Sequence, residues 1–212
     1  MMKIPRCFLL LTSLVLLSAC GPLYGQSMKL SEGLKGYEVV KGDVAELKKV
    51  KNLLVLGPFL GASDEHHMCI PREEGTFPFT SDIIFISKHN DAQRFAAAFE
   101  KAGLFDTELY LEVYYDRIEE TTKRLRAMNR LEMEKELKLK TAPELVLFGV
   151  VKKIEHKIAP LRGVLVDVQY ELEFYNPETR QSIVIDVAVF EMFNEDMNTI
   201  VKEIKNRMAG GR

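Results

Sequence analysis

The chain has 212 residues, of which 47% are apolar, and its formal net charge is −2 at pH 7. That length and apolar content are sufficient for one domain with a buried core. The near balance of charge excludes a broad basic surface that would neutralise phosphates, so we expect no nucleic-acid partner. No segment after residue 20 is long and apolar enough to cross a bilayer as a helix.

The amino-terminal residues have the three-part layout of a secretion signal. Two basic residues, Lys3 and Arg6, are followed by an apolar segment over residues 8–17 and then by small residues. The apolar segment is too short to span a membrane, and this order is typical of a cleaved signal peptide. The sequence therefore predicts a signal peptide over residues 1–19. Two alternatives to the lipoprotein signal described next stay open. One is an ordinary cleaved signal in which the cysteine at position 20 occurs by chance, and the other is an apolar amino terminus that is not cleaved.

The four residues at the predicted cleavage position, Leu17-Ser18-Ala19-Cys20, resemble the lipobox of bacterial lipoproteins. The resemblance implies that Cys20 begins the mature chain and carries a diacylglycerol and an amide-linked acyl chain such as palmitate. One acyl chain binds a membrane only marginally, whereas several anchor a protein stably. Because Gly21 rather than Asp follows the cysteine, resemblance to Gram-negative lipoproteins favours the outer membrane. We expect a lipid-anchored protein on its periplasmic face.

Residues 20–36 are predicted to form a lipidated tether, and residues 37–209 the folded domain. The tether contains Gly, Pro and Ser with few apolar residues. At about 3.3–3.6 Å per residue it reaches at most ~55 Å from the membrane. Because Cys7 leaves with the signal and Cys20 carries lipid, Cys69 has no disulfide partner, so the domain must be stabilised by core burial.

The first half of the domain alternates between short strands, loops and one clear helix. A helical turn capped by Asp43 precedes a buried strand over residues 53–56. Residues 61–80 have no period and are predicted to form a long loop, and residues 82–86 a second short strand. A helix is predicted over residues 90–102, with these small or aromatic residues on one face: Ala92, Phe95, Ala96, Phe99 and Ala102.

The second half begins with a left-handed cap at Gly103 and a strand over residues 109–115. A highly charged helix over residues 116–140 follows, and its thin apolar seam (Ile118, Leu125, Met128, then Leu131 or Glu132) predicts a break near Asn129. A strand with an internal Gly149 is predicted over residues 145–151. An antiparallel hairpin follows, with strands over residues 164–175 and 183–189, and a final helix is predicted over residues 195–208.

These elements predict a single α/β (α+β) domain. Its mixed sheet of four to five strands should contain the antiparallel hairpin, with the helices packed on the sheet. Phe95 and Phe99 should pack beneath the sheet, against four residues of its strands: Val55, Leu147, Tyr170 and Ile185.

The order of elements resembles the small α/β domain shared by the TolB amino-terminal domain, the curli secretion lipoprotein and the penicillin-binding-protein activator lipoproteins. The matching segments are Val55–Phe59, Phe95–Phe105, Leu145–Val150 and Tyr170–Ile185. The hairpin turn departs from these families, because Asn176…Thr179-Arg180 stands where they have Asp…Thr-Gly. The relatives are not enzymes, so the resemblance implies no catalytic residue and no cofactor.

Residues 64–69, Asp-Glu-His-His-Met-Cys, are the one cluster of metal-ligand types in the sequence. Imidazole and thiolate suit zinc or copper, but no second ligand pair has a recognised spacing, so we expect no metal. Glu171 and Glu173 lie one pleat apart on the polar face of the hairpin, where a solvated strand explains them better than acid–base chemistry. No phosphate-binding loop, dinucleotide fingerprint or nucleophile elbow occurs.

The sequence thus favours a non-enzymatic, membrane-anchored lipoprotein that acts as a protein-interaction or envelope-assembly module of the cell envelope. Its partner would be a periplasmic or outer-membrane protein, or further copies of itself. The loop over residues 61–80 is the favoured interface, because it offers four large apolar side chains beside charges: Met68, Ile70, Phe77 and Phe79. The alternatives are an activator of a penicillin-binding protein, which the short tether disfavours, and a small metal-binding protein or hydrolase that uses the same loop.

Overall fold

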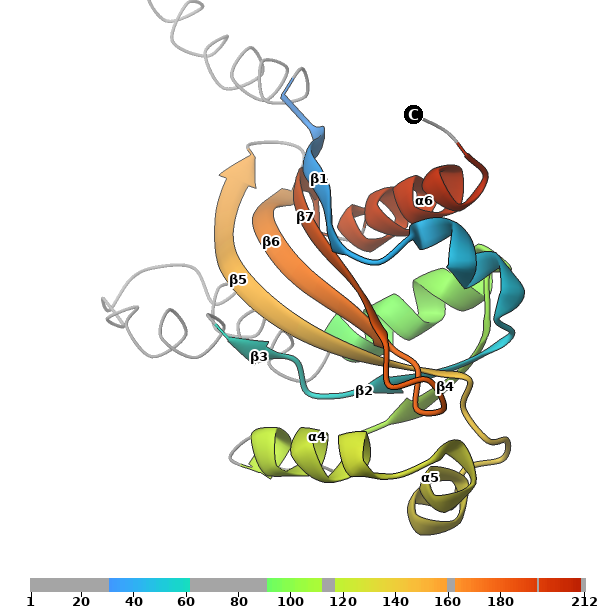
Figure 1. The fold of residues 1–212 in the computed structure, drawn as a ribbon. Coiled ribbons are helices and arrows are strands. Elements are labelled where there is room, and N and C mark those ends of the chain that lie inside the picture. The colour runs from blue at the N-terminus through green and yellow to red at the C-terminus, as the bar shows by residue number, and fades with distance from the viewer. Residues whose placement is uncertain (1–30, 62–90, 112–116, 160–162, 194, 211–212) are drawn as a thin grey trace, which may run out of the picture.

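A single mixed β-sheet organises the described part of the protein (Figure 1). The computed structural model describes residues 31–61, 91–111, 117–159, 163–193 and 195–210. Within these ranges the sheet has seven strands in the order β1-β7-β6-β5-β2-β4, and β3 pairs with β5. The strands are β1 (Gly33–Lys41), β2 (Asn52–Leu56), β3 (Leu60–Gly61), β4 (Asp106–Tyr110), β5 (Leu145–Ala159), β6 (Gly163–Tyr175) and β7 (Ser182–Met192).

The strand directions confirm the predicted mixed α/β (α+β) architecture, with more strands than the four or five predicted. β2 runs parallel to β4 and β5, whereas β5, β6, β7 and β1 pair antiparallel. The predicted hairpin is the β6–β7 pair, in which Tyr170 lies opposite Val187. The additional strands are β1 and the two-residue β3, which the sequence does not predict because neither has an alternating apolar pattern.

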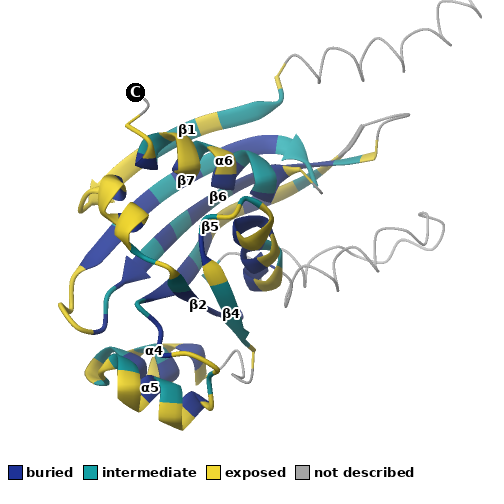
Figure 2. Cartoon of the chain, turned by 90° about the vertical axis from the view of Figure 1, so that its right-hand side faces the viewer, coloured by how far each residue is buried: buried dark blue, intermediate teal, exposed yellow. Residues whose placement is uncertain are grey.

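Helices cover both faces of the sheet where β2 and β5 meet (Figures 1 and 2). One face carries η1 (Val44–Lys49), the helix of residues 91–101 and α6 (Asp196–Met208). The other carries α4 (Ile118–Ala127) and α5 (Arg130–Leu137). Figure 2 shows buried residues where strands and helices face each other, and exposed ones on the outer helix surfaces. None of the described helices has the length and apolar character needed to span a membrane.

The larger core is built around stacked and edge-to-face aromatic rings. Phe95 lies 6.0 Å from Phe99 and 5.2 Å from Tyr170 between ring centroids. Phe95 and Phe99 are fully buried in one cluster with the four strand residues predicted to contact them. The predicted packing of this helix face is therefore confirmed. Aromatic pairs in such geometries add stability beyond the area that they bury.

Gly149 allows β5 to approach this core closely. A Cβ atom at this position would lie 2.3 Å from the ring of Phe59, so only glycine leaves room for that ring. Close packing against Phe59 thus accounts for the glycine inside β5. The caps predicted at Asp43 and Gly103 are also confirmed, because the Asp43 carboxylate accepts a hydrogen bond from Ala45 N at 2.8 Å and Gly103 has φ +63°.

The charged helical region breaks at Asn129, as predicted. Asn129 caps α5 and forms a capping box with Glu132, so the helical phase restarts at this residue. As a result, Met133 and Leu137 face the smaller core, whereas Leu131 is 66% exposed. The predicted continuation of the apolar seam through Leu131 or Glu132 is therefore wrong.

Several boundaries also differ from those predicted, and β5 continues to Ala159, well beyond the strand predicted over residues 145–151. Gly33–Gly36, included in the predicted tether, belong to β1, which pairs with β7. β4 begins at Asp106 and ends at Tyr110, earlier than the strand predicted over residues 109–115. The strand begins earlier because Asp106 and Thr107 pair with β2 despite being polar. The strand predicted over residues 82–86 lies outside the described residues.

Candidate functional site

The residues that the sequence selects for function lie outside the described part of the chain. These are the predicted lipidation residue Cys20, the cluster over residues 64–69 and the four apolar interface candidates Met68, Ile70, Phe77 and Phe79. Among the described residues, no group of three or more His, Cys, Asp or Glu side chains is arranged to hold a metal ion. The geometry of the described residues offers other candidates.

The most unusual of these candidates is a buried ionic cluster between the helix of residues 91–101 and the start of α6. Arg94 donates hydrogen bonds to the Asp196 carboxylate and to the carbonyl oxygen of Phe193. It also donates to Asp91 Oδ1 at 3.3 Å, and its guanidinium lies 4.1 Å from the centroid of the Phe193 ring. The side chains of Arg94, Asp91 and Asp196 are 14%, 6% and 0% exposed. One arginine therefore joins two buried aspartates that belong to different helices.

Burial dominates the electrostatics of this cluster. It raises the pKa of Asp91 to about 6 and that of Asp196 to about 7, although Arg94 acts in the opposite direction on both. The Tyr170 hydroxyl lies beside Asp91, and burial raises its pKa well above the usual value. Within the described structure, neither this hydroxyl nor Asp196 Oδ2 has a hydrogen-bond partner of ordinary geometry. Shifted carboxyl groups of this kind mark functional sites as well as structural ion pairs.

Sequence reasoning misses this cluster because each member has an ordinary local explanation. Asp91 and Asp196 lie in the first turns of their helices, where acidic residues are favoured by the helix dipole. Arg94 and Asp196 are 102 residues apart, so only the packing of the two helices brings them together. The only indication of the cluster in the sequence is that the acidic Asp196 adjoins Met197, which belongs to the apolar face of α6.

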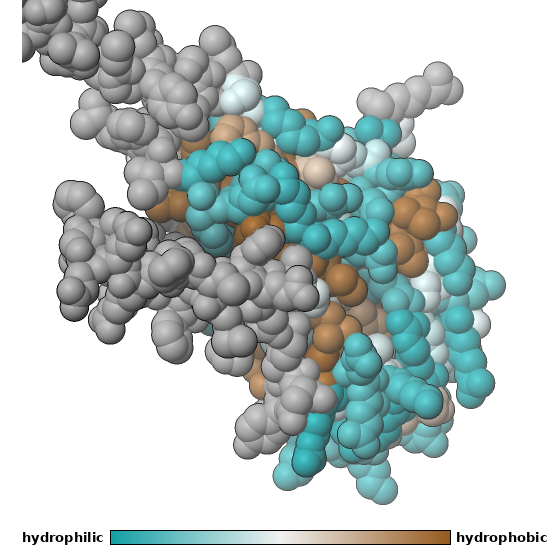
Figure 3. Space-filling view, turned by 90° about the vertical axis from the view of Figure 1, so that its left-hand side faces the viewer, coloured by the Kyte–Doolittle hydropathy of each residue, from teal (hydrophilic) through white to brown (hydrophobic). Residues whose placement is uncertain are grey.

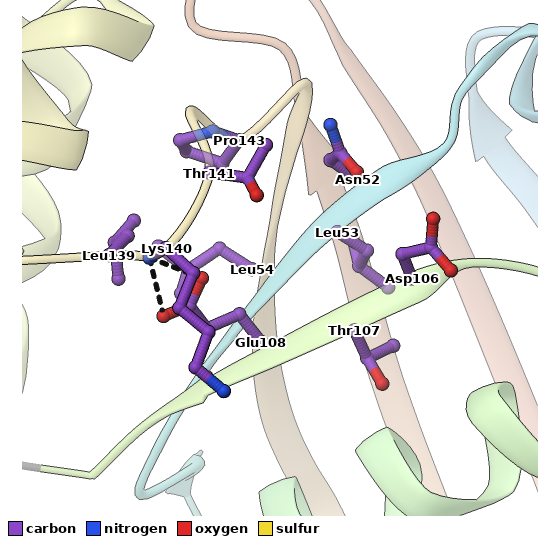
Figure 4. Close-up of a pocket in the computed structure, with 10 residues that line it drawn as sticks. All are labelled: Asn52, Leu53, Leu54, Asp106, Thr107, Glu108, Leu139, Lys140, Thr141 and Pro143. Atoms are coloured by element: carbon purple, nitrogen blue, oxygen red, sulfur yellow. Dashed lines mark hydrogen bonds between the residues drawn. The ribbon is translucent and has the colours of Figure 1, made fainter.

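A second candidate is a small pocket of about 180 Å³ between β2, β4 and residues 139–143 (Figure 4). Glu108 reaches across it and accepts hydrogen bonds from the backbone nitrogen of Lys140 at 3.0 and 3.1 Å. The pocket is smaller than most ligand sites, which have volumes of about 300–1,000 Å³. Because Glu108 already tethers the 139–143 segment, we assign the pocket a structural role.

A third candidate is a groove of about 680 Å³ between η1 and the β6–β7 turn. Its floor is apolar and includes Leu47, Phe174 and Ile183, which are nearly fully buried. Its rim carries both signs of charge, with Lys41 and Glu46 among the lining residues. The size suits a ligand, but the mixed rim selects no particular ligand chemistry.

Ion pairs occupy the polar face of the hairpin. Lys152 contacts Glu171 at 2.8 Å and Asp186 at 2.7 Å, whereas Glu173 pairs with Arg126 of α4. Burial alone would raise the pKa of Glu173, but hydrogen bonds from Arg126 and Ser182 lower it below the usual value. Glu171 and Glu173 thus pair with different cations, and Lys152 also pairs with Asp186, which favours a structural role. On the side of the molecule drawn in Figure 3, hydrophilic side chains cover much of the described surface, and apolar groups lie between them.

Comparison with known proteins does not assign a family. No family model matches the chain, and no curated protein matches it. Two solved structures of a PelC dodecamer from Paraburkholderia phytofirmans are similar in arrangement, each with 9% sequence identity. In the first, of a PelC variant, the alignment covers 82% of this chain and 94% of that chain, with a TM-score of 0.42. In the second structure the alignment covers 84% of this chain and 98% of the PelC chain, with a TM-score of 0.39.

Proposed function

We propose that this protein is a lipid-anchored, non-enzymatic interaction module on the periplasmic face of the outer membrane. The observation that carries the proposal is the Leu17–Cys20 lipobox after a secretion-signal layout. β1 begins at Gly33, so only residues 21–32 separate the lipid from the sheet. At about 3.3–3.6 Å per residue this connector spans at most ~43 Å. Such a length holds the domain close to the membrane and is unfavourable for an activator that must cross the periplasm.

The module acts by docking a periplasmic or outer-membrane protein, or further copies of itself. Anchoring raises the effective concentration of the domain at the membrane, so weak contacts suffice there. The loop over residues 61–80 supplies the contact through Met68, Ile70, Phe77 and Phe79. The separate cations held by Glu171 and Glu173 support a binding role over acid–base catalysis.

Replacing Cys20 with Ala tests the anchor. We expect the wild-type mature chain to begin at residue 20 and to carry acyl chains, as measured by intact mass and peptide mapping of the membrane fraction. The Cys20→Ala chain should lack the acyl mass, because the thiol that accepts the lipid is absent. Cys69→Ala is the matched control and should remain acylated. A mature amino terminus elsewhere than Cys20 contradicts the proposal.

Replacing Phe77 and Phe79 with Ser tests docking through the loop. We expect the variant to fold normally but to lose the protein that co-purifies with the wild type from crosslinked membranes, because large apolar anchors dominate interface energies. Leu131→Ser is the control, since Leu131 is 66% exposed on α5, far along the chain from the loop. Full retention of the partner refutes this interface, and unfolding of the variant assigns the two rings to the core instead.

A further inference from the structure

The buried cluster of Asp91, Arg94 and Asp196 contains two carboxyl groups and one cation. We propose that this cluster is a proton-dependent latch that holds the first turn of α6 against the helix of residues 91–101. The latch is closed when the two carboxyl groups share one proton, and it loosens when that proton is lost.

Charge counting within the cluster gives the physical basis. One guanidinium neutralises one carboxylate, so a second ionised carboxylate would be an uncompensated charge in the interior, which is costly. Asp91 and Asp196 are 6% and 0% exposed, so solvent cannot supply the compensation. Asp196 Oδ2 has no hydrogen-bond partner in the described structure, since Arg94 is bound through Oδ1. A single shared proton makes the whole cluster neutral.

No second cation in the described elements around the cluster reaches the two carboxylates to replace that proton. β6 contributes the neutral Tyr170 hydroxyl, and β5 contributes His156, whose ring lies 6.1 Å from that of Phe193. Lys101 and Asn198 line an open depression of about 230 Å³ beside Arg94, on its outer side. Among the described residues, the charge balance at this place therefore rests on Asp91, Arg94 and Asp196.

The latch controls the corner between β7 and α6. Arg94 holds both the carbonyl oxygen and the ring of Phe193, which follows the last residue of β7. The next turn is closed by a hydrogen bond from Glu195 N to Met192 O at 2.8 Å. Beyond it, Met197 and Ile200 of α6 enter the main core. Loss of the proton therefore weakens the attachment of the first turn of α6 to the core.

The sign of the pH dependence follows from proton binding. The pKa values of Asp91 and Asp196 are about 6 and about 7 in the folded protein, above the ordinary value of 3.8. The folded pair therefore holds protons that the unfolded chain has already released, and the last of them, the proton on which the latch depends, is lost near pH 7. The stabilisation by the cluster is fully present near pH 4 and is lost as the pH rises through 6 and 7. Each proton released on unfolding raises the unfolding equilibrium constant by up to about tenfold per pH unit.

Urea unfolding of the full mature chain between pH 5 and pH 8 tests the latch. For the wild type we expect the unfolding equilibrium constant to rise by about tenfold or more over this range. Asp91→Asn and Asp196→Asn should each show a rise of less than about threefold, because one carboxylate then faces one arginine. Hydrogen exchange of the first turn of α6 should likewise become pH-independent in the variants, after correction for the intrinsic rate.

Two controls isolate the cluster from other titrating groups. Glu195→Gln removes an exposed carboxyl group next to Asp196 in the chain, and its unfolding equilibrium constant should depend on pH as that of the wild type does. His156→Asn removes the neighbouring histidine and should keep the wild-type pH profile of unfolding as well. A flat wild-type profile, or Asn variants that retain the full slope, overturns the proposal.

A direct measurement covers the case in which the Asn variants do not fold. Carboxyl carbon resonances of the wild-type protein, followed by NMR during a pH titration, should show an aspartate with a midpoint near 6 or above. If no aspartate titrates above about pH 5, a value close to ordinary aspartates, the latch does not exist.

Discussion

Phe99→Ala should lower the free energy of unfolding by about 3–5 kcal/mol, the usual cost of truncating a buried phenylalanine. Phe99 is fully buried and its ring centroid lies 5.4 Å from that of Phe105 and 6.1 Å from that of Phe174. Truncation removes these ring contacts and leaves a cavity between the helix and the sheet. A loss of this size is a large part of the typical stability of a domain.

The measurement for Phe99→Ala is urea unfolding at pH 5 followed by circular dichroism, with the wild type in parallel. Leu131→Ala serves as the control, because Leu131 is 66% exposed and its truncation should change the stability by less than about 0.5 kcal/mol. An unchanged unfolding midpoint for Phe99→Ala would show that this helix face does not contact the sheet.

The parts of the fold that sequence could predict are those in which a local pattern coincides with the tertiary role. The helix of residues 91–101 and the β6–β7 hairpin have regular apolar periods, and their inward residues form the main core. Phe95 and Tyr170 are examples, since each occupies the inward phase of its element. The resemblance of Leu17–Cys20 to a lipobox can likewise be seen in the sequence because the four residues are contiguous, and lipidation there stays a prediction.

The parts that sequence could not predict depend on partners distant in the chain. β1 contains Gly33 and Gly36, which weaken a strand pattern, and it becomes a strand because it pairs with β7. A Cβ atom at Gly36 would lie 3.7 Å from that of Ala188, an ordinary contact, so the packing does not require glycine there. The apolar pattern predicts a seam that continues through Leu131 or Glu132, but the cap at Asn129 resets the helical phase. The Asp91–Arg94–Asp196 cluster exists only after two helices have packed.

Arg94→Met should destabilise the protein by about 3–5 kcal/mol at pH 8, because removing one partner of a buried ion pair leaves uncompensated charge. Here two buried carboxylates, Asp91 and Asp196, lose their single cation. The loss should be smaller at pH 5, since protonation of both carboxyl groups removes the charge that Arg94 compensated. Because Arg94 lowers the pKa of both carboxyl groups, they should keep their protons to higher pH in the variant, so its stability should still fall with pH where that of the wild type has levelled off.

Urea unfolding of Arg94→Met at pH 5 and pH 8 measures this effect, and Arg207→Met provides the comparison. Arg207 pairs with Glu203 at 2.7 Å within α6 and is 37% exposed. Surface pairs of this kind contribute about 0–1 kcal/mol, so Arg207→Met should have a small and pH-independent effect. Equal destabilisation of Arg94→Met at both pH values would mean that Arg94 acts through its packing on Phe193 rather than through its charge. Recovery of the variant in acid would instead identify charge compensation as the role of Arg94.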